Sequence, residues 1–535
     1  MVEIKLHLSR KNWASIEDNS FVIGTAFKDN TLTDAKEIAR KLPNLSESFS
    51  FWEDFLQSYN GFYSLIKKDE NGNLFAAVDQ IRSLPLFYSF INNSFYISDS
   101  AEWIRGELNL KELDPLAKDE FQLTGYVTGK ETLFKEIKQI QAGECLQLVE
   151  GVLKTHRYYL FTHTEPQQYN EEELYQELYK VSKLSIERLI KYANGRQIVI
   201  PLSGGYDSRL IATLLKELNY QNILCFTYGP KGNKEAAYSK IVADSLGLKW
   251  HFVEYTEELW NQAWHTETRK RYSKFASNYV SLPHIQDWLA VKVMHEQGVL
   301  EQDAVFVPGH SGDMTAGSHI PKYVFEDLTK MYSKDDLINH LFEKHYCLTT
   351  LNNIKTPTSF FKERIAFSID ERDLYSATQF SDEAEMYNWQ NRQSKYICNS
   401  IRVYDQFGYN WWLPMWEKEF ISFFENLPLK LRNHDWYVKF VSELYGKYSS
   451  STQLDNASEK SPVFKIVYSL VIKNDFIKSV SRSVYRLFKK ESVKNNAFCL
   501  VLDKDQYYKK RKQGFSVIGI FSKWNLDETI HHLSR

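Results

Sequence analysis

The fold of the larger part of the chain is decided by seven residues, Ser203-Gly204-Gly205-Tyr206-Asp207-Ser208-Arg209. They follow a short apolar run, residues 197–202, and precede a helical pattern over residues 206–218. The two glycines leave backbone N–H groups open to an anion, and the following helix adds unpaired N–H groups and the positive end of its dipole. With Ser203 and Ser208 as hydroxyl donors, the stretch predicts a phosphate-binding loop between a strand and a helix.

Asp207 is unusual in such a loop, because a carboxylate beside a polyphosphate is repelled unless a cation lies between them. Mg²⁺ is the usual mediator, held by carboxylates together with phosphate oxygens. The stretch is not a Walker A loop, which requires GxxxxGK[ST]. The alternative is a glycine turn in which a serine or an aspartate caps the following helix.

Outward from this loop, apolar strand-like runs alternate with helical patterns. This alternation predicts a parallel sheet with helices on both faces. The expected helices are residues 172–192, 206–218 and 233–246, and the expected strands are residues 197–202, 222–227, 249–254 and 304–307. Residues from about 321 to 535 are mostly helical in pattern.

The first 160 residues or so have a different pattern, with short apolar runs joined by turns. Asn71-Gly72 and Asn92-Asn93 each separate two such runs, and these residues tolerate the positive φ of hairpin turns. An antiparallel sheet or sandwich is expected here. We expect the boundary in the polar stretch that follows, which gives two domains, residues 1–165 and residues 172–535.

The overall composition is that of a globular protein. The 535 residues include 66 Lys and Arg against 68 Asp and Glu, a formal net charge of -2, and 43% are hydrophobic. A near-neutral balance argues against nucleic acid as the principal partner. No run approaches the ~20 apolar residues of a membrane span, and the five cysteines form no CxxC pair. Neither a disulfide framework nor a zinc site is expected, and a reducing cytoplasm fits best.

The stretch SGGYDSR resembles the pyrophosphate-binding motif of the asparagine synthetase family of ATP-dependent amide-forming enzymes. Upstream, residues 61–63, 79–88, 125–127, 132–137 and 142–143 are similar to the glutaminase-type domain of that family. The resemblance implies an α/β plus α+β architecture. A sandwich of the Ntn-hydrolase αββα type would come first, followed by a PP-loop, Rossmann-like synthetase domain with a helical carboxyl-terminal part.

A second stretch, Gly309-His310-Ser311-Gly312-Asp313-Met314, resembles the SGxGxDE motif of the family. By that match Asp313 is a second Mg²⁺ ligand beside Asp207, Gly309 belongs to the ATP site, and Met314 replaces an acidic residue. The resemblance also places the adenine near residues 227–229, and Glu235 near the nucleotide or the metal. A first-turn glutamate that favours the helix dipole is the alternative for Glu235. The residues expected to receive the adenine are Thr227, Tyr228 and Gly229.

Two further positions carry expected catalytic roles. His310 stands where family members have Glu or Tyr, and a histidine that titrates near neutrality suits a general base toward the incoming amine. The alternative is a histidine that only hydrogen-bonds the loop. Lys512 matches the lysine of the RxKxGF element, which would neutralise charge on the α-phosphate and on the oxyanion. The alternative for the basic run at residues 509–512 is a solvated helix face.

The amino-terminal domain departs from the glutamine-dependent members. These have a nucleophilic cysteine after the initiator Met, whereas this chain has Val2, and no segment of the form NGEIYN is found between residues 21 and 54. Cys145 lies in an apolar run and is expected to pack as a small hydrophobe. The sequence therefore predicts a domain that has kept its fold and lost glutaminase activity.

The expected function is an ATP- and Mg²⁺-dependent ligase that activates a carboxylate as an acyl-adenylate and joins it to an amine or ammonia. Residues 409–412 replace the EVR of the family, which argues against plain aspartate as the acid. The alternatives left open are an asparagine synthetase that uses ammonia, uronic-acid amidation, lasso-peptide or β-lactam cyclisation, and a non-catalytic scaffold.

The basic, amphipathic stretch over residues 463–490 has three interpretations. It could form a lid, contact an anionic membrane or a lipid-linked substrate, or pack as a helix pair with an ordinary basic face. Assembly into a homo-oligomer is also left open.

Overall fold

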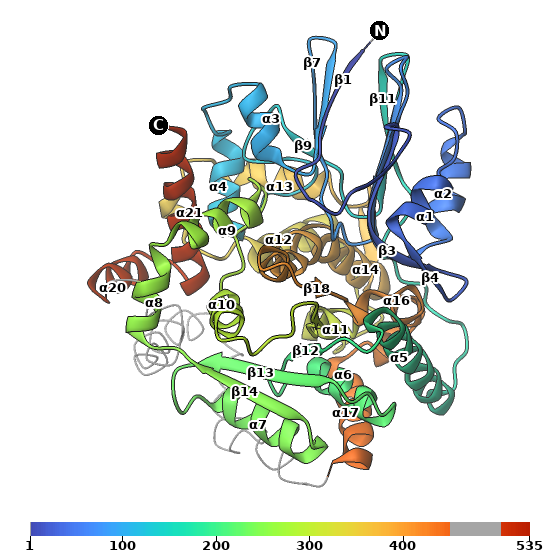
Figure 1. Cartoon of the computed structure of the whole chain (residues 1–535), viewed down its shortest axis with the longest axis vertical. Coiled ribbons are helices and arrows are strands. Elements are labelled where there is room, and N and C mark those ends of the chain that lie inside the picture. Colours follow the sequence, from blue (N-terminus) through green and yellow to red (C-terminus); the bar gives the residue numbers. More distant parts are fainter. Residues whose placement is uncertain (1, 450–503, 535) are drawn as a thin grey trace.

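The computed structural model describes residues 2–449 and 504–534 (Figure 1). A strand-rich part lies at the top of Figure 1, a parallel sheet lies at the bottom, and the carboxyl-terminal helices lie at the left. Within the described residues, no helix has the length and apolar character needed to cross a membrane. The stretch 463–490 lies outside the described residues.

The strand-rich part contains two sheets. One has the order β1-β8-β7-β9, and the other has the order β11-β10-β6-β5-β3-β2 with β4 paired to β3. The pairing is antiparallel as expected, except that β1 runs parallel to β8. The strands are β1 (Glu3–His7), β2 (Ala14–Ile16), β3 (Ser20–Lys28), β4 (Thr31–Asp34), β5 (Asn60–Lys68), β6 (Leu74–Val78), β7 (Phe87–Ile91), β8 (Ser94–Ser98), β9 (Lys138–Gln139), β10 (Glu144–Val149) and β11 (Val152–Arg157).

Helices cover the outer faces of these sheets. One buried cluster, with Ile66 and Phe95 among its members, joins the two sheets. A second cluster lies between the larger sheet and its helices, where Trp52 stacks on Phe75 with ring centroids 3.6 Å apart. Helix α3 packs on β7 and β8 of the smaller sheet, so the two sheets lie between two helical layers. The helices are α1 (Ala35–Arg40), α2 (Phe49–Gln57), α3 (Ala101–Glu107) and α4 (Pro115–Thr124).

The five-stranded sheet of the other part of the chain is parallel throughout, in the order β14-β13-β12-β15-β18. This confirms the parallel sheet expected from the alternating pattern. Figure 1 shows α7 on one side of β13 and β14, and α10 on the other. The strands are β12 (Ile198–Pro201), β13 (Ile223–Gly229), β14 (Lys249–Glu254), β15 (Val305–Phe306) and β18 (Asn410–Trp411). The helices of this part are α5 (Glu171–Ala193), α6 (Tyr206–Glu217), α7 (Lys234–Leu246), α8 (Glu257–Trp264), α9 (Glu267–Ser277), α10 (Trp288–Glu296) and α11 (Gly312–Thr315).

The rest of the described chain is mostly helical, as expected. A two-stranded sheet of β16 (Met331–Ser333) and β17 (Leu374–Ser376) interrupts it. A π-helix, Trp389–Ile397, is followed by a 3₁₀ turn, Cys398–Ile401. The α-helices are α12 (Lys334–His345), α13 (Thr358–Ala366), α14 (Ala377–Asn388), α15 (Arg402–Gln406), α16 (Lys418–Glu425), α17 (His434–Tyr448), α20 (Lys504–Lys512) and α21 (Val517–Leu533).

The two parts are joined by a continuous buried core and by buried polar contacts. Phe62 of β5 meets Trp412 with ring centroids 4.8 Å apart. Arg188 of α5 donates to Asn30 of the strand-rich part and to Glu417, which lies just before α16. A buried guanidinium with these partners is costly to separate from them. The strand-rich part is therefore docked firmly on the parallel sheet.

Candidate functional site

The first loop of the site connects β12 to α6. Gly205 occupies the position before the helix, and no side chain caps the helix there. A serine or aspartate cap is therefore not the role of this loop, and the first-turn N–H groups are not satisfied by a capping side chain. Such a helix start favours an anion through its N–H groups and its dipole.

The serines of this loop differ in their surroundings. Ser203 is exposed, and its Oγ accepts from the Gly205 N–H at 3.2 Å. Ser208 is buried, and its hydroxyl has no hydrogen-bond partner among the described residues. The Gly204 carbonyl accepts from Arg209 Nη2 at 2.7 Å, which holds the loop against its helix. A buried hydroxyl without a partner is expensive in a folded protein, so Ser208 fits a site for a polar ligand.

The second loop follows β15, the strand next to β12 in the sheet. Between these two strands the chain order reverses, and in parallel sheets ligands bind at the carboxyl ends of the strands on either side of such a reversal. The loop brings Asp313 against the first loop, and the Asp313 N–H donates to Asp207 Oδ2 at 3.1 Å. The two aspartates that the motifs predicted as a pair therefore meet.

Two glycines of the second loop make this contact possible. A Cβ atom on Gly309 would lie 2.6 Å from the Ser208 nitrogen, and one on Gly312 would lie 2.7 Å from Asp207 Cγ. Both separations are shorter than side-chain carbons tolerate, so neither position accepts a larger residue without moving the opposite loop. The two loops therefore pack closely, with the Asp207 carboxylate against the backbone of Gly312 and Asp313.

The surroundings of the Asp207 side chain disfavour its negatively charged form. Burial is the largest cause that raises its pKa, to about 7, and the neighbouring Asp313 carboxylate raises it further. Asp313 N–H and the Tyr437 phenol of α17 act in the opposite direction. A cation between the carboxylates would relieve both effects. The described residues contain no group of three or more His, Cys, Asp or Glu side chains placed to hold a metal, so other ligands would have to complete the coordination.

His310 lies in the same cavity, and its pKa differs from the expectation. Burial lowers the pKa of His310 to about 4, with a further contribution from His284. The expected titration near neutrality is therefore wrong for the protein without ligand, in which the imidazole is neutral. The Ser400 hydroxyl lies 3.2 Å from either ring nitrogen, so one hydrogen-bond partner holds the ring.

The cavity formed by these loops has a volume of about 220 Å³. Tyr228, at the end of β13, lines it and stacks on Tyr255 with ring centroids 5.0 Å apart. Thr227 beside it is buried. The expected adenine position at the end of β13 thus borders the cavity through Tyr228. The described lining residues are Pro201, Ser203, Gly205, Tyr206, Asp207, Ser208, Tyr228, His284, Asp287, Pro308, Gly309, His310 and Tyr404.

Six of the predicted positions do not line the cavity: Gly204, Thr227, Gly229, Glu235, Asp313 and Lys512. Glu235 is exposed in the first turn of α7, where its charge contributes to the raised pKa of Tyr228. Lys512 is exposed at the end of α20, which Figure 1 places at the left edge, apart from α6 and α11. The structure therefore brings together the two loops and Tyr228, and leaves Glu235 and Lys512 outside.

Three lining residues were not anticipated from the sequence. His284 and Asp287 precede α10, with His284 Nδ1 3.1 Å from Asp287 Oδ1, and the Tyr404 hydroxyl of α15 donates to Asp287 Oδ2 at 3.1 Å. The sequence signal for these three residues is a His-x-x-Asp pair, which is too common in proteins to identify a site. Together they form a polar wall opposite the two loops.

Within the part of the chain that the structure describes, neither Val2 nor Cys145 of the amino-terminal domain lines the cavity between that domain and the parallel sheet. Val2 is buried in the core between the sheets, and a Cβ on Gly72 would contact its backbone. Figure 1 places this end of the chain at the top, away from the parallel sheet. Cys145 is buried in β10, where burial raises the pKa of its thiol to about 12. Such a thiol is not a nucleophile at neutral pH.

Comparison with known proteins gives two family matches. Residues 193–442 match the asparagine synthase model, and residues 45–159 match a glutamine amidotransferase domain. A probable glutamine-hydrolysing asparagine synthetase of Acanthamoeba polyphaga mimivirus is 28% identical over 197 residues, which are 36% of this chain and 34% of the relative. The matched region thus spans about a third of that relative.

Solved structures were compared as well. An NH3-dependent NAD synthetase from Campylobacter jejuni is 17% identical, with a TM-score of 0.20, over 28% of this chain and 61% of its own. A predicted tRNA methyltransferase subunit from Methanocaldococcus jannaschii is 19% identical, with a TM-score of 0.15, over 34% of this chain and 81% of its own. The sequence matches, and not these structures, support an asparagine synthetase family protein.

Proposed function

We propose that this protein is an ATP- and Mg²⁺-dependent ligase that joins a carboxylate to an amine or ammonia, with release of AMP and pyrophosphate. The observation that carries the proposal is the meeting of Asp207 and Asp313 at the junction of two loops, beside an uncapped helix start. Family membership supports the same activity. The two domains would be residues 1–165, of the Ntn-hydrolase type, and residues 172–535.

In this proposal the first loop holds the pyrophosphate part of ATP. The N–H groups at the start of α6 and the buried, unpartnered Ser208 hydroxyl offer hydrogen-bond donors to it. Ser203 and Gly309 border the same space. The adenine would lie toward Thr227, Tyr228 and Gly229 at the end of β13.

The residues present fit a magnesium ion. The Asp207 carboxylate, which accepts from the Asp313 N–H, and the Asp313 carboxylate would supply two ligands from separate loops, and phosphate oxygens of the nucleotide would complete the ligand set, as is usual for this ion. Bound there, Mg²⁺ would offset the negative charge of the triphosphate. The raised pKa of Asp207 is a further indication that a cation belongs between the carboxylates.

The chemistry follows from the poor leaving group of a free carboxylate. A carboxylate oxygen attacks the α-phosphorus, the bond to pyrophosphate breaks, and the acyl group becomes a mixed anhydride with AMP. The amine nitrogen then adds to the carbonyl carbon, loses a proton, and expels AMP. Lys512 would approach on substrate binding to neutralise charge on the α-phosphate and the oxyanion.

His310 is proposed as the group that takes the proton from the amine. Its imidazole is neutral, so a ring nitrogen is available as an acceptor. The negative charge of a bound triphosphate would raise its pKa from about 4 toward the range of a general base. Asp287, whose charge acts on His310 in the direction that raises its pKa, would stabilise the positive charge that develops.

ATP–pyrophosphate exchange over a panel of acids tests the proposal, and the acid that supports exchange identifies the substrate. Asp207→Asn should reduce exchange by more than about a hundredfold, because the carboxylate that completes the metal site is lost. Asp303→Asn is the matched control, since Asp303 is exposed before β15 and lines neither cavity. An Asp207→Asn protein with an unchanged exchange rate would refute the site, and the absence of exchange with every acid class would refute the reaction.

A further inference from the structure

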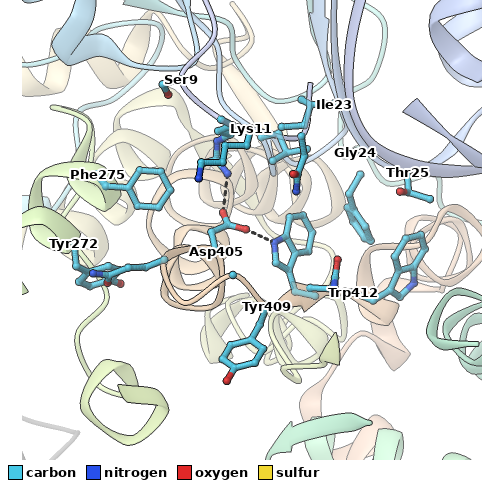
Figure 2. Close-up of a pocket in the computed structure, with 18 of the residues that line it drawn as sticks. Ser9, Lys11, Ile23, Gly24, Thr25, Tyr272, Phe275, Asp405, Tyr409 and Trp412 are labelled. Carbon is cyan, nitrogen blue, oxygen red and sulfur yellow. Dashed lines mark hydrogen bonds and ion pairs between the residues drawn. The ribbon is translucent and has the colours of Figure 1, made fainter. Parts of the chain in front are cut away.

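A second and larger cavity lies between the amino-terminal domain and the parallel sheet (Figure 2). Its volume is about 820 Å³, within the range of small-molecule sites. Figure 2 shows Lys11, Ile23 and Gly24 on one side and Tyr272, Asp405 and Tyr409 on the other. It therefore opens between two domains, where binding sites are frequent.

The charges on its wall are unequal. Of the described residues that line it, three are cationic, Arg10, Lys11 and Arg271, and one is acidic, Asp405. Asp405 is already neutralised, because Arg10 and Arg402 each lie 2.8 Å from its Oδ2. Burial alone would raise the pKa of Asp405, but these two guanidinium groups outweigh it and lower the pKa. The cavity therefore keeps an excess of positive charge.

Two of the three cationic side chains are not held by a hydrogen bond or an ion pair to another described residue. Within residues 2–449 and 504–534, the side chains of Lys11 and Arg271 make no hydrogen bond or ion pair, and both residues are exposed. Arg10, in contrast, is fixed by Asp405 and by the ring of Phe275, whose centroid lies 5.0 Å from the guanidinium carbon. The site thus combines one anchored cation with two that are available to an anion.

Seven of the other lining residues are aromatic. Phe275 is half-buried at the rim, and Trp411 is held by a hydrogen bond of 2.8 Å from its Nε1 to Asp405 Oδ1. Rigid rings of this kind give an apolar or planar ligand a large contact area at little entropic cost. The aromatic residues that line the cavity are Phe62, Tyr192, Tyr272, Phe275, Tyr409, Trp411 and Trp412.

We propose that this interdomain cavity is a binding site for a small organic anion with a planar or apolar body. A carboxylate or phosphate group of the ligand would face Lys11 and Arg271, and the body would pack against Phe275 and Trp411. The inference does not depend on the proposed ligase activity, because none of these residues lines the nucleotide cavity. Glutamine is a poor fit, since it has no net negative charge and no planar or apolar body.

Titration of the full chain with matched aromatic probes tests the site, with tryptophan fluorescence and calorimetry as readouts. Benzoate and phenyl phosphate should bind saturably, whereas benzamide, benzylamine and glutamine should bind at least about tenfold more weakly because they lack net negative charge. The stronger of the two anions shows whether the site prefers a carboxylate or a phosphate.

A double variant, Lys11→Gln with Arg271→Gln, should weaken anion binding by about tenfold or more and leave ATP–pyrophosphate exchange unchanged. Lys270→Gln is the matched control on the same helix, because Lys270 pairs with Glu267 and does not line the cavity. Equal binding of benzamide and benzoate, no binding of either anion at roughly 10 mM, or full affinity in the double variant would each overturn the proposal.

Discussion

Gly312 lies opposite the Asp207 carboxylate, and its lack of a side chain is a requirement of the site. A Cβ there would approach Asp207 Cγ to 2.7 Å, so alanine must displace the carboxylate or the loop that carries it. Shifts of about 1 Å in a catalytic group can cost a hundredfold in rate.

Gly312→Ala should therefore lower ATP–pyrophosphate exchange by about a hundredfold while the protein stays folded. Gly106→Ala serves as the control, because Gly106 lies in α3 with no atom within 4 Å of an added Cβ. Circular dichroism and the exchange rate together check the expectation. If Gly312→Ala catalysed exchange at the wild-type rate, the position of the Asp207 carboxylate would not matter for the reaction.

His310 is proposed to act in amide formation, whereas the metal-site aspartates are proposed to act in the earlier reaction of the acid with ATP. Variants of the two kinds should therefore differ in their effects on ATP–pyrophosphate exchange. His310→Ala should leave ATP–pyrophosphate exchange intact and lower amide formation from ammonia by about a hundredfold, as for loss of a general base. Release of AMP and amide, measured with the acid found by exchange, checks this. The exposed His265 gives the control variant, His265→Ala. Equal loss of exchange and amide formation would assign His310 a role in the nucleotide site instead.

At the scale of elements, the π-helix Trp389–Ile397 holds the second loop in place. Ser311, at a left-handed φ of 70°, donates its buried hydroxyl to Gln393 Oε1 at 2.7 Å, and Ser400 follows on the next turn beside His310. π-helical segments are rare and are frequent at functional sites. The wide turn thus orients a loop that carries Gly309, His310 and Asp313.

Gln393→Leu should destabilise the protein by about 1–3 kcal/mol, because the Ser311 hydroxyl loses its acceptor in a buried position. Adding Ser311→Ala should restore much of this stability, since removal of both partners is nearly neutral. Chemical denaturation of the three variants measures the difference. A double variant no more stable than Gln393→Leu would contradict the account.

The elements around the first loop could be predicted closely from the sequence, and those that complete the cavity could not. β12, β13, α6 and α7 lie within two residues of their expected ranges, because each has its own apolar pattern and glycine or asparagine boundaries. β18 has two residues and therefore no periodicity, and its partner β15 lies about a hundred residues earlier.

In the candidate site, too, the sequence predicts what local motifs encode and not what long-range packing brings together. Asp207 and Asp313 were paired by motif, whereas Tyr404 and Asp287 meet only through the packing of α15 against α10. The pKa of His310 depends on its burial beside His284, which no local pattern encodes. Local chemistry was therefore predictable, and contacts made by tertiary packing were not.

At the scale of the whole molecule, the amino-terminal domain is expected to be inactive toward glutamine. No described residue that lines the interdomain cavity is a cysteine, and Cys145 is buried with a raised thiol pKa. Pure protein incubated with glutamine should release no glutamate above the buffer rate. Val2→Cys should not restore hydrolysis, because position 2 lies in the core between the sheets. Sustained glutamate release by either protein would contradict this expectation.

The contact of Phe62 with Trp411 and Trp412 gives the amino-terminal domain a second role. β18 is an edge strand, and an edge strand offers unpaired backbone groups on which a second chain can add by β-pairing. The amino-terminal domain covers the indole rings beside this edge and so hides an aggregation-prone surface. A chain that lacked the amino-terminal domain would expose these indole rings to solvent, and it is expected to be less soluble than the full chain.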